Sequence, residues 1–366
     1  MHGDRLLLGP GPSTPYPEAV EALARPVLGH LDPEYLALIH ETGDRLRQVF
    51  RTENPLTLPV SGTGSAGMEA CLASLLEPGE TVIVGVNGYF GERLCEVAHR
   101  GGARVVRVEA PWGTALDPAD VLAAHRAHPQ AALVAVVAAE TSTGVRNDVA
   151  PLGPELAQTD TLLLVDAVTA LGGTPLEVDA WQIDACYSAS QKCLGAPPGL
   201  APVTLGPRAV AKMRNRTTPI HSFYLDLGLL HDYFLASPPR YHHTASSTLA
   251  YALHAGLGRL LEEGVESVWD RHARVGALLQ SELPELGFSL VAPDGSRLPQ
   301  LTTAVLPDGL EDGPARTRLL AEYGIEVGGG LGDLAGRAWR IGLMGHAATE
   351  RSVVTLLGAT RELLKA

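Results

Sequence analysis

One lysine of this sequence stands in a setting where its amine could do chemistry. Lys192 lies between an apolar run, ACYSAS, that is typical of a strand, and a Gly/Pro-rich segment that cannot continue as a helix. In a cleft beside another cation its ammonium form would be disfavoured, and the neutral amine would serve as nucleophile and base. Because an isolated lysine is usually a solvated surface residue, this interpretation needs a partner residue.

Asp166 is that partner. It lies at the end of the apolar run TLLLVDA, and the next apolar run along the chain, ACYSAS, leads to Lys192. Adjacent parallel strands bring their carboxyl ends to one edge of a sheet, so both side chains can face one ligand. A carboxylate beside the pyridine nitrogen of pyridoxal 5'-phosphate (PLP) keeps that nitrogen protonated and the ring electron-withdrawing. A helix cap or a metal ligand is the alternative for Asp166. Without a nearby His/Asp cluster, we predict no metal site.

A phosphate could bind at the glycine-rich turn SGTGSAGMEACLASL, which follows the run PLTLPV and leads into a predicted helix. Thr63, Gly64 and Ser65 would line this turn. The sequence from Gly62 to Gly67 also matches the motif GxGxxG, which by itself is only weak evidence for dinucleotide binding. An NAD-type oxidoreductase would need an acidic residue at the end of the next run, TVIVGV, and this run ends in Asn87 and Gly88 instead. That alternative is therefore the less favoured one.

Seven short apolar runs between about residues 55 and 207 alternate with several helical patterns. This alternation predicts an α/β fold with a mainly parallel seven-stranded sheet that is covered on both faces. Short strands among helices near the C-terminus predict a smaller α+β domain. In a chain of 366 residues we expect an N-terminal arm over residues 1–20, a large domain over 21–263 and a small domain over 264–366.

The composition excludes several other classes of protein. With 28 Lys+Arg against 41 Asp+Glu, the net charge is -13 and no basic run stands out, so nucleic acid is an unfavourable partner. The start, MHGDRLLLGPGP, has too short an apolar run for a signal peptide or a membrane span. The four cysteines lack metal-type spacing, and free thiols in a reducing compartment predict a cytoplasmic protein.

In this order, the motifs resemble the class V aminotransferases of PLP fold type I, particularly the alanine–glyoxylate and serine–pyruvate aminotransferases. The resemblance covers nearly the whole chain and includes LLLGPGPS, NPLTLPVSGTGSAGMEA, NGYFGER, ETSTGV, LLLVDAVTALGGTPLEVD, YSASQKCLGAPPG, YHHTAS and WRIGLMG. It implies that Lys192 forms the internal aldimine, that Gln191 approaches the phosphate and that Asp166 pairs with the ring nitrogen. It also places a hydroxyl, Thr141, beside the ring and a stacking aromatic, Phe90, over it. Some family members have tryptophan at the position of Phe90, and a smaller ring covers less of the cofactor.

The same resemblance implies a homodimer, in which Tyr241 and Thr244 reach the phosphate of the neighbouring subunit's cofactor. The adjacent His242 and His243 suggest metal binding when they are taken alone, but neighbouring residues alternate in direction and no third ligand is evident, which favours a structural role. Arg340 would bind the substrate carboxylate through a planar guanidinium, and it supplies the local positive charge that an acidic protein needs to bind anionic substrates. Gly11 would lie near the substrate.

We hypothesise transamination between a small amino acid, alanine or serine, and a 2-oxo acid, glyoxylate or pyruvate, by a ping-pong mechanism through the Lys192 aldimine. A ureidoglycine–glyoxylate or an aminophosphonate aminotransferase is the alternative within the family. A cysteine desulfurase would need a thiol in the loop before Arg340, and no cysteine follows Cys193. A PLP-binding regulator or a silent relative is disfavoured because Lys192, Asp166, Gln191 and Arg340 are all present.

Overall fold

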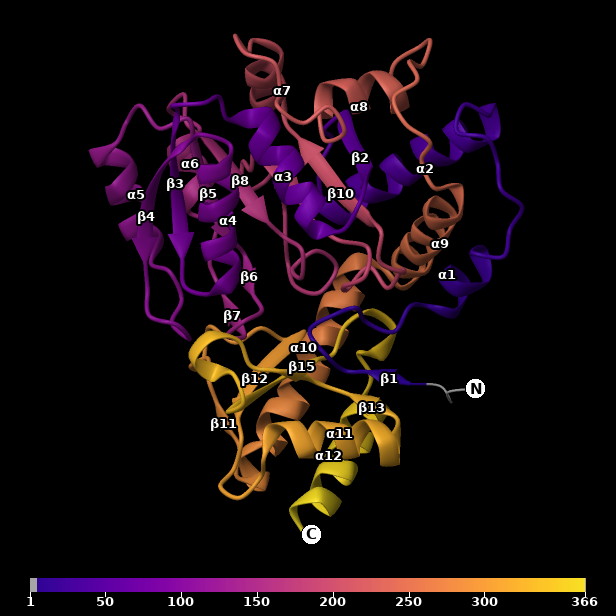
Figure 1. The fold of residues 1–366 in the computed structure, drawn as a ribbon, viewed down its shortest axis with the longest axis vertical. Helices are drawn as coiled ribbons and strands as arrows, with labels where there is room; N and C mark the ends of the chain where they lie inside the picture. Colours follow the sequence, from indigo (N-terminus) through magenta and orange to yellow (C-terminus); the bar gives the residue numbers. More distant parts are fainter. Residues whose placement is uncertain (1–4, 366) are drawn as a thin grey trace.

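The computed structural model describes residues 5–365, and its larger domain is built around a seven-stranded sheet (Figure 1). The strand order is β2-β10-β9-β8-β5-β3-β4, and β10 runs antiparallel to both of its neighbours, whereas the other paired strands are parallel. Each of the seven predicted runs contains a strand, so the expected α/β fold is confirmed. The strands are β2 (Leu56–Ser61), β3 (Thr81–Val86), β4 (Arg104–Glu109), β5 (Leu133–Val137), β8 (Leu162–Asp166), β9 (Ala185–Tyr187) and β10 (Leu200–Leu205).

Helices cover both faces of this sheet, because side chains alternate between two apolar cores along each strand. Val82 and Val84 pack on one side with α3, α4, α7 and α8, whereas Ile83 packs on the other side with α5, α6 and α9. The inner strand β5 is buried along its whole length, as a parallel sheet covered on both faces requires. The helices are α1 (Pro17–Ala22), α2 (Pro33–Phe50), α3 (Gly64–Leu75), α4 (Tyr89–Arg100), α5 (Pro118–Ala127), α6 (Leu152–Leu156), α7 (Pro207–Arg214), α8 (Leu227–Phe234) and α9 (Ser247–Glu263).

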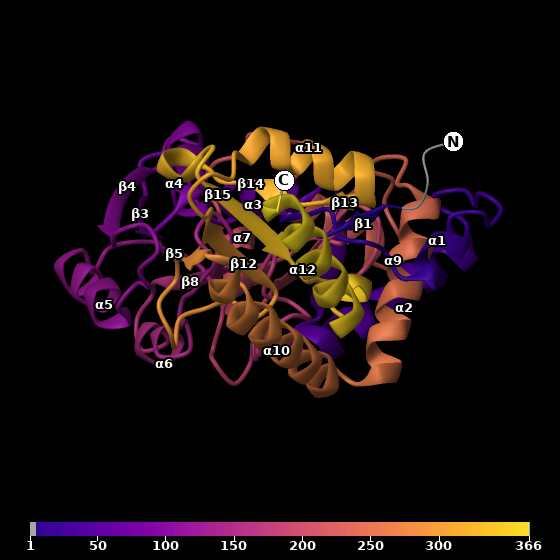
Figure 2. The same ribbon diagram turned by 90° about the horizontal axis from the view of Figure 1, so that it is seen from below.

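The smaller domain has an antiparallel sheet of order β11-β12-β15-β14, and its helices surround that sheet when the molecule is seen from below (Figure 2). Trp339 and Ile341 of β15 belong to its apolar core together with residues of α10, α11 and α12. The strands are β11 (Ser289–Leu290), β12 (Leu301–Val305), β13 (Ile325–Glu326), β14 (Gly328–Gly329) and β15 (Ala338–Gly342), the helices are α10 (Val265–Glu282), α11 (Asp312–Tyr323) and α12 (Glu350–Leu364), and the short 3-10 turns are η1 (Pro284–Leu286), η2 (Gly332–Leu334) and η3 (Gly345–Ala347).

The N-terminal segment touches both domains. Its strand β1 (Leu6–Leu7) pairs in parallel with β13 of the small domain, whereas α1 packs against α9 of the large domain. The chain passes between the domains at Gly264, where α9 ends and α10 begins. This geometry is consistent with the division into residues 1–20, 21–263 and 264–366, which remains our proposal. Between residues 5 and 365, no helix has both the length and the apolar character needed to cross a membrane.

A short hairpin, β6 (Ala139–Glu140) and β7 (Val145–Arg146), follows β5 at the edge of the large sheet that faces the small domain (Figure 1). The strand β9 is shorter than the predicted run, because it ends at Tyr187. The backbone N–H groups of Ser188 and Ser190 still donate to Pro202 and Leu200 of β10. The segment that leads to Lys192 is therefore tied to the sheet although it is not regular strand.

Candidate active site

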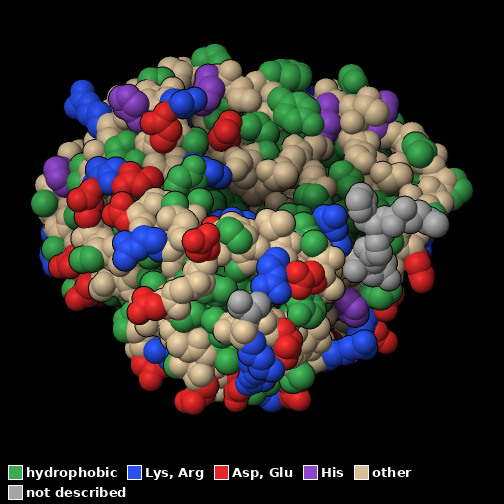
Figure 3. Space-filling model, turned by 60° about the horizontal axis from the view of Figure 1, so that its bottom comes forward, with side chains coloured by type: hydrophobic (Ala, Val, Ile, Leu, Met, Phe, Trp, Pro, Cys, Tyr) green, Lys and Arg blue, Asp and Glu red, His purple; other side chains and the backbone are tan. Residues whose placement is uncertain are grey.

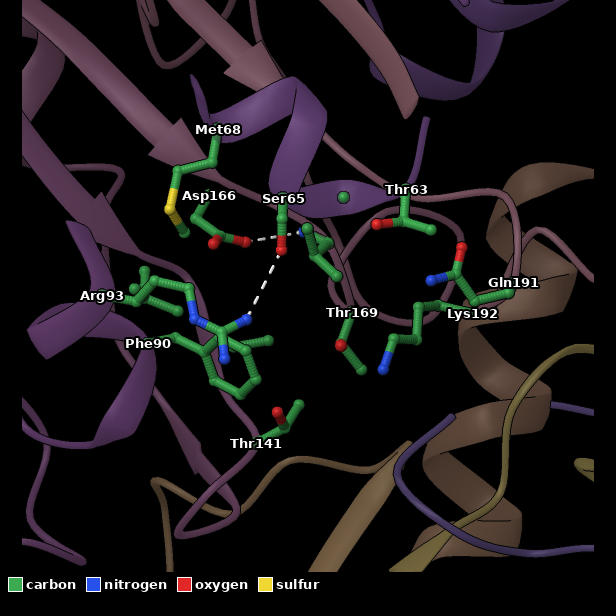
Figure 4. A pocket seen from close by; sticks show the side chains of 14 residues that line it. Thr63, Ser65, Met68, Phe90, Arg93, Thr141, Asp166, Thr169, Gln191 and Lys192 are labelled. Carbon is green, nitrogen blue, oxygen red and sulfur yellow. Dashed lines mark hydrogen bonds between the residues drawn. The ribbon is translucent and has the colours of Figure 1, made fainter. Parts of the chain in front are cut away.

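A cavity of about 190 Å³ lies at the carboxyl ends of the parallel strands. Open parallel sheets bind ligands at this edge. The space-filling view is hollowed across the middle of the molecule, where the two domains meet, and Lys or Arg atoms are visible in this region (Figure 3). The side chains that line the cavity come from separate segments and point into a common space (Figure 4). The lining residues are Thr63, Gly64, Ser65, Met68, Phe90, Arg93, Val137, Ala139, Thr141, Asp166, Val168, Thr169, Gln191 and Lys192.

Lys192 lies at this cavity in a half-buried position, and its Nζ donates a hydrogen bond to the carbonyl of Pro10. Burial lowers the pKa of Lys192 to about 8, and the positive charge of Arg340 adds to this lowering. The neutral amine is therefore more populated near physiological pH than it is for an ordinary lysine. The chain contains three lysines, and the other two pair with carboxylates, Lys212 with Glu80 and Lys365 with Glu362.

Asp166 ends β8 and is 3% exposed. Its Oδ2 accepts a hydrogen bond of 2.7 Å from the Tyr187 hydroxyl, and its Oδ1 accepts one of 2.9 Å from the backbone N–H of Val168. Burial raises the pKa of Asp166, and these two hydrogen bonds oppose the rise. A carboxylate oxygen can accept more than one hydrogen bond, so Asp166 can also receive a cationic N–H from a ligand in the cavity.

The glycine-rich turn forms the end of the cavity where a phosphate would bind. Thr63 is the N-cap of α3, and the first N–H groups of a helix have no acceptor within the helix. The backbone of Gly64 lies so close to Val168 that a Cβ atom would stand 2.8 Å from its Cγ2. Among the residues that the structure describes, the buried side-chain oxygen of Gln191 has no hydrogen-bond partner. The free N–H groups at the start of α3 and the close backbone approach of Gly64 fit a bound phosphate, as expected for PLP. The Gln191 oxygen is an acceptor, so only the amide NH2 of this side chain could donate to a phosphate.

Phe90 and Thr141 also line the cavity, from α4 and from the residue after β6. Their place is compatible with the predicted contacts to a flat ring. Eight predicted residues therefore share one cavity: Thr63, Gly64, Ser65, Phe90, Thr141, Asp166, Gln191 and Lys192. The functional role of each remains a proposal.

Arg93 is a cavity residue that the sequence interpretation missed. Its Nη1 donates to the Ser65 hydroxyl at 3.4 Å, and its guanidinium carbon lies 5.2 Å from the centroid of the Phe90 ring. Figure 4 shows it between Ser65 and Phe90. The spacing of three residues from Phe90 puts both side chains on one face of a helix. That periodicity could have identified Arg93.

Two predicted substrate residues lie beside the cavity rather than in its lining. Gly11 packs directly on Lys192: a Cβ atom at Gly11, whose φ is +119°, would stand 2.4 Å from Nζ. Arg340 is half-buried on β15, and its Nε donates to the carbonyl of Gly329 at 2.8 Å. Within residues 5–365 no hydrogen bond to its two terminal nitrogens is found, so both can face a carboxylate.

The structure places Tyr241 and Thr244 on the surface, outside the lining of the cavity of their own chain, and Tyr241 is 61% exposed. The neighbouring histidines have structural contacts, as expected. His243 Nε2 bonds to the Ser61 hydroxyl at 2.7 Å, and His242 Nε2 bonds to the carbonyl of Phe223 at 2.9 Å.

Comparison with known proteins assigns this arrangement to a family. The class-V aminotransferase family model matches residues 16–335. An alanine–glyoxylate aminotransferase of Callithrix jacchus is 39% identical, over 99% of this chain and 88% of the relative.

Two solved structures have the same fold over the whole chain. An alanine–glyoxylate aminotransferase from Nostoc sp. shares 46% identity, with a TM-score of 0.96 over 100% of this chain and 96% of that one. A ureidoglycine–glyoxylate aminotransferase from Bacillus subtilis shares 37% identity, with a TM-score of 0.97 over 100% of this chain and 94% of that one. The alternative of an NAD-type oxidoreductase, in which the glycine-rich turn would bind a dinucleotide, is therefore wrong.

Proposed function

The chain belongs to the class-V aminotransferases, which are PLP-dependent enzymes, and from this premise we propose that it transfers amino groups from alanine or serine to glyoxylate or pyruvate. The observation that carries the proposal is the pairing of a depressed-pKa lysine, Lys192, with a buried carboxylate, Asp166, in one cavity. Their chemistry matches amino-group transfer, because one side chain can be neutral at physiological pH and the other can face a cationic ring.

The cavity residues fit the cofactor as follows. Thr63, Gly64, Ser65 and Gln191 would hold its phosphate, Asp166 would accept a hydrogen bond from its ring nitrogen, and Phe90 and Thr141 would contact the ring. When bound, PLP supplies an electron-withdrawing ring that stabilises negative charge at the α-carbon of the substrate. Asp166 supports that effect because its carboxylate keeps the ring nitrogen in the protonated form.

Lys192 has two tasks in this proposal. Its neutral Nζ would hold the cofactor, and the same nitrogen, when free, would take the proton from the substrate α-carbon. A pKa of about 8 suits a base that must work near neutral pH. Arg340 orients the substrate carboxylate through its two terminal nitrogens. Because both substrates use these same side chains in turn, we expect ping-pong kinetics.

The names of the relatives support glyoxylate as the amino acceptor, since both the alanine and the ureidoglycine aminotransferases carry it in their names. They do not agree on the donor. Ureidoglycine is therefore the second candidate donor, supported by the 37% identity to the Bacillus subtilis enzyme. An aminophosphonate is a further candidate donor, because the guanidinium of Arg340 can bind a phosphonate as well as a carboxylate in two parallel hydrogen bonds.

A donor panel tests this proposal. The purified enzyme with PLP and glyoxylate would receive alanine, serine, ureidoglycine or 2-aminoethylphosphonate, and the glycine formed would be measured by chromatography. We expect kcat/KM to be highest for alanine or serine. A higher value for ureidoglycine would establish the alternative, and no glycine from any donor would contradict aminotransfer to glyoxylate.

We further propose that the active unit is a homodimer. Large exposed apolar side chains gather near Tyr241: the nearby chain segments expose Val27 by 78%, Phe223 by 65% and Tyr224 by 47%. The ring of Tyr241 stands 4.9 Å from that of His30, next to the segment of Val27. Exposed apolar patches of this kind mark protein–protein contacts. A second copy that covers the patch would receive Tyr241 and Thr244 at its own phosphate site.

We also infer a cytoplasmic location for the enzyme. The cysteines of the described chain are free and buried, namely Cys71, Cys95, Cys186 and Cys193. Free thiols persist in reducing compartments, which supports this inference.

A further inference from the structure

The first turn of α4 is held by a carboxylate from another element. Glu140 ends β6 and is fully buried. Its Oε2 accepts hydrogen bonds from the backbone N–H groups of Phe90 at 3.1 Å and of Gly91 at 3.3 Å. A carboxylate at this place satisfies two of the N–H groups that a helix start leaves without acceptors, and it interacts favourably with the helix dipole.

The other oxygen of Glu140 is bound to its own hairpin. Oε1 accepts from the backbone N–H of Ser142 at 3.0 Å and from the Ser142 hydroxyl at 2.6 Å. The same hydroxyl accepts the backbone N–H of Tyr89 at 3.0 Å. Glu140 and Ser142 together therefore clamp the start of α4 to the β6–β7 hairpin.

The packing around this clamp leaves no spare room. A Cβ atom at Gly88 would stand 2.4 Å from Cγ and Cδ of Glu140 and from the Ser142 hydroxyl. The φ of Gly88 is 174°, which any residue can adopt. Glycine is thus required at position 88 by the closeness of the Glu140 side chain, and not by its own backbone conformation.

The two elements that Glu140 joins carry the two residues expected on the cofactor ring. Phe90 donates its N–H directly to Glu140, and Thr141 is the next residue in the chain. Phe90 is only half-buried, so core packing alone does not fix its ring. Burial raises the pKa of Glu140, and the hydrogen bonds that its carboxylate accepts oppose this rise. In its charged form Glu140 also raises the pKa of Arg340 against the lowering effect of burial.

We propose that Glu140 is a positioning residue, which sets the stacking ring of Phe90 and the hydroxyl of Thr141 against the cofactor without touching the cofactor itself. This inference rests on the proposed roles of Phe90 and Thr141. It predicts that loss of the Glu140 charge changes the binding and the orientation of PLP, beyond any effect on folding.

Glu140→Gln tests the inference. Backbone N–H groups donate to both oxygens of Glu140, so the NH2 group of a glutamine would face a donor in either orientation. We expect PLP affinity to fall by about 10- to 100-fold, as the loss of a charge-assisted hydrogen bond implies. The circular dichroism of bound PLP should weaken as well, because this signal reports the orientation of the ring. Titration of the apoenzyme with PLP, followed by absorbance and circular dichroism, measures both effects without turnover.

Asp184→Asn is the matched control. Asp184 is also a buried carboxylate of the large domain, 7% exposed, and accepts from the backbone N–H of Leu163 at 2.8 Å, but it does not line the cavity. This variant should lower the melting temperature and leave the affinity and dichroism of PLP unchanged. If Glu140→Gln matches this control, with loss of stability alone, the positioning role is refuted.

Ser142→Ala keeps the test decisive if Glu140→Gln does not fold. It removes the 2.6 Å hydrogen bond to Glu140 and the acceptor for Tyr89, and leaves the carboxylate in place. A smaller loss of PLP affinity, about 3- to 10-fold, would support the inference. Unchanged PLP affinity and dichroism in Ser142→Ala would overturn it. If the wild-type protein itself binds no PLP, the failure lies with the cofactor assignment and not with Glu140.

Discussion

At the scale of single residues, burial decides which side chains are reactive. Cys193 follows Lys192 and is fully buried, and burial raises the pKa of its thiol to about 12, which leaves it inert. Burial acts in the opposite direction on Lys192, because the charged form of an amine is the protonated one. Burial therefore keeps the thiol protonated and unreactive, and it favours the neutral, nucleophilic form of the amine. A desulfurase reaction, which needs a reactive thiol, has no support in this site.

The rate at which the apoenzyme captures PLP should rise with pH, with a midpoint near the Lys192 pKa of about 8. The sign follows from the chemistry: below this pKa the amine is protonated and is not a nucleophile, and above it the neutral form predominates. Stopped-flow absorbance across a series of buffers would measure the profile. A midpoint at the ordinary lysine value of 10.5 would show that burial does not tune this amine.

Asp166→Asn should reduce kcat/KM by about 100- to 1,000-fold, the scale of losing one preorganised electrostatic contact. Asparagine can still accept from Tyr187, but it has no charge to keep the ring nitrogen protonated. Steady-state kinetics at saturating PLP would measure the loss. Turnover close to that of the wild type would remove Asp166 from the proposed mechanism.

At the scale of elements, one sheet edge assembles the site. The strands β2, β3, β5 and β8 run in the same direction, and their last residues are Ser61, Val86, Val137 and Asp166. The next segments supply the glycine-rich turn, Phe90 and Thr141. The alternation of strands and helices was sufficient to predict that the strand ends, the glycine-rich turn and Asp166 share one edge. Phe90 and Thr141 were expected there only from the resemblance to the family.

Other features were beyond the sequence pattern. The antiparallel direction of β10 was not predicted, because a buried strand is equally apolar in either direction. Glu140 was missed because it looks like any polar residue after a strand until the fold brings α4 against it. The contact of Gly11 with Lys192 joins positions far apart in the chain. Such contacts depend on tertiary packing, which periodicity does not describe.

The N-terminal arm should matter for Lys192. In Gly11→Ala the added methyl group would push the lysine from its rotamer, at about 1 kcal/mol or roughly fivefold in PLP affinity. The positive φ would also cost about 1–2 kcal/mol of stability. Gly309→Ala is the matched control, because Gly309 has a φ of +85° and nothing within 4 Å. Equal PLP affinities in the two variants would argue against a role of the arm.

At the scale of the whole molecule, we propose that the site is completed by a second subunit. Tyr241 is exposed and does not line the cavity of its own chain, which supports the proposal that it contacts the phosphate site of a second subunit. Two-fold dimers place equivalent patches against each other, and each subunit would then contribute to both sites.

Subunit complementation tests this arrangement. Lys192→Ala and the double variant Tyr241→Ala/Thr244→Ala, co-expressed with different tags, should form mixed dimers with one complete site of two. We expect about half of the wild-type activity per mixed dimer. Lys192→Ala co-expressed with Asp166→Asn is the control and should stay inactive, because both residues act in one subunit. Failure of the first pair to recover activity would place Tyr241 and Thr244 outside the partner's site.

Chemical trapping can test whether Lys192 carries the cofactor. Borohydride reduction of the PLP-loaded enzyme makes a lysine–cofactor bond permanent, and peptide mass spectrometry then locates it. The sequence is well suited to this measurement, because Lys192, Lys212 and Lys365 are its three lysines. We expect stoichiometric modification at Lys192, and its loss after the enzyme is treated with alanine before reduction. Modification at Lys212 or Lys365, or the absence of any modified lysine, would contradict it.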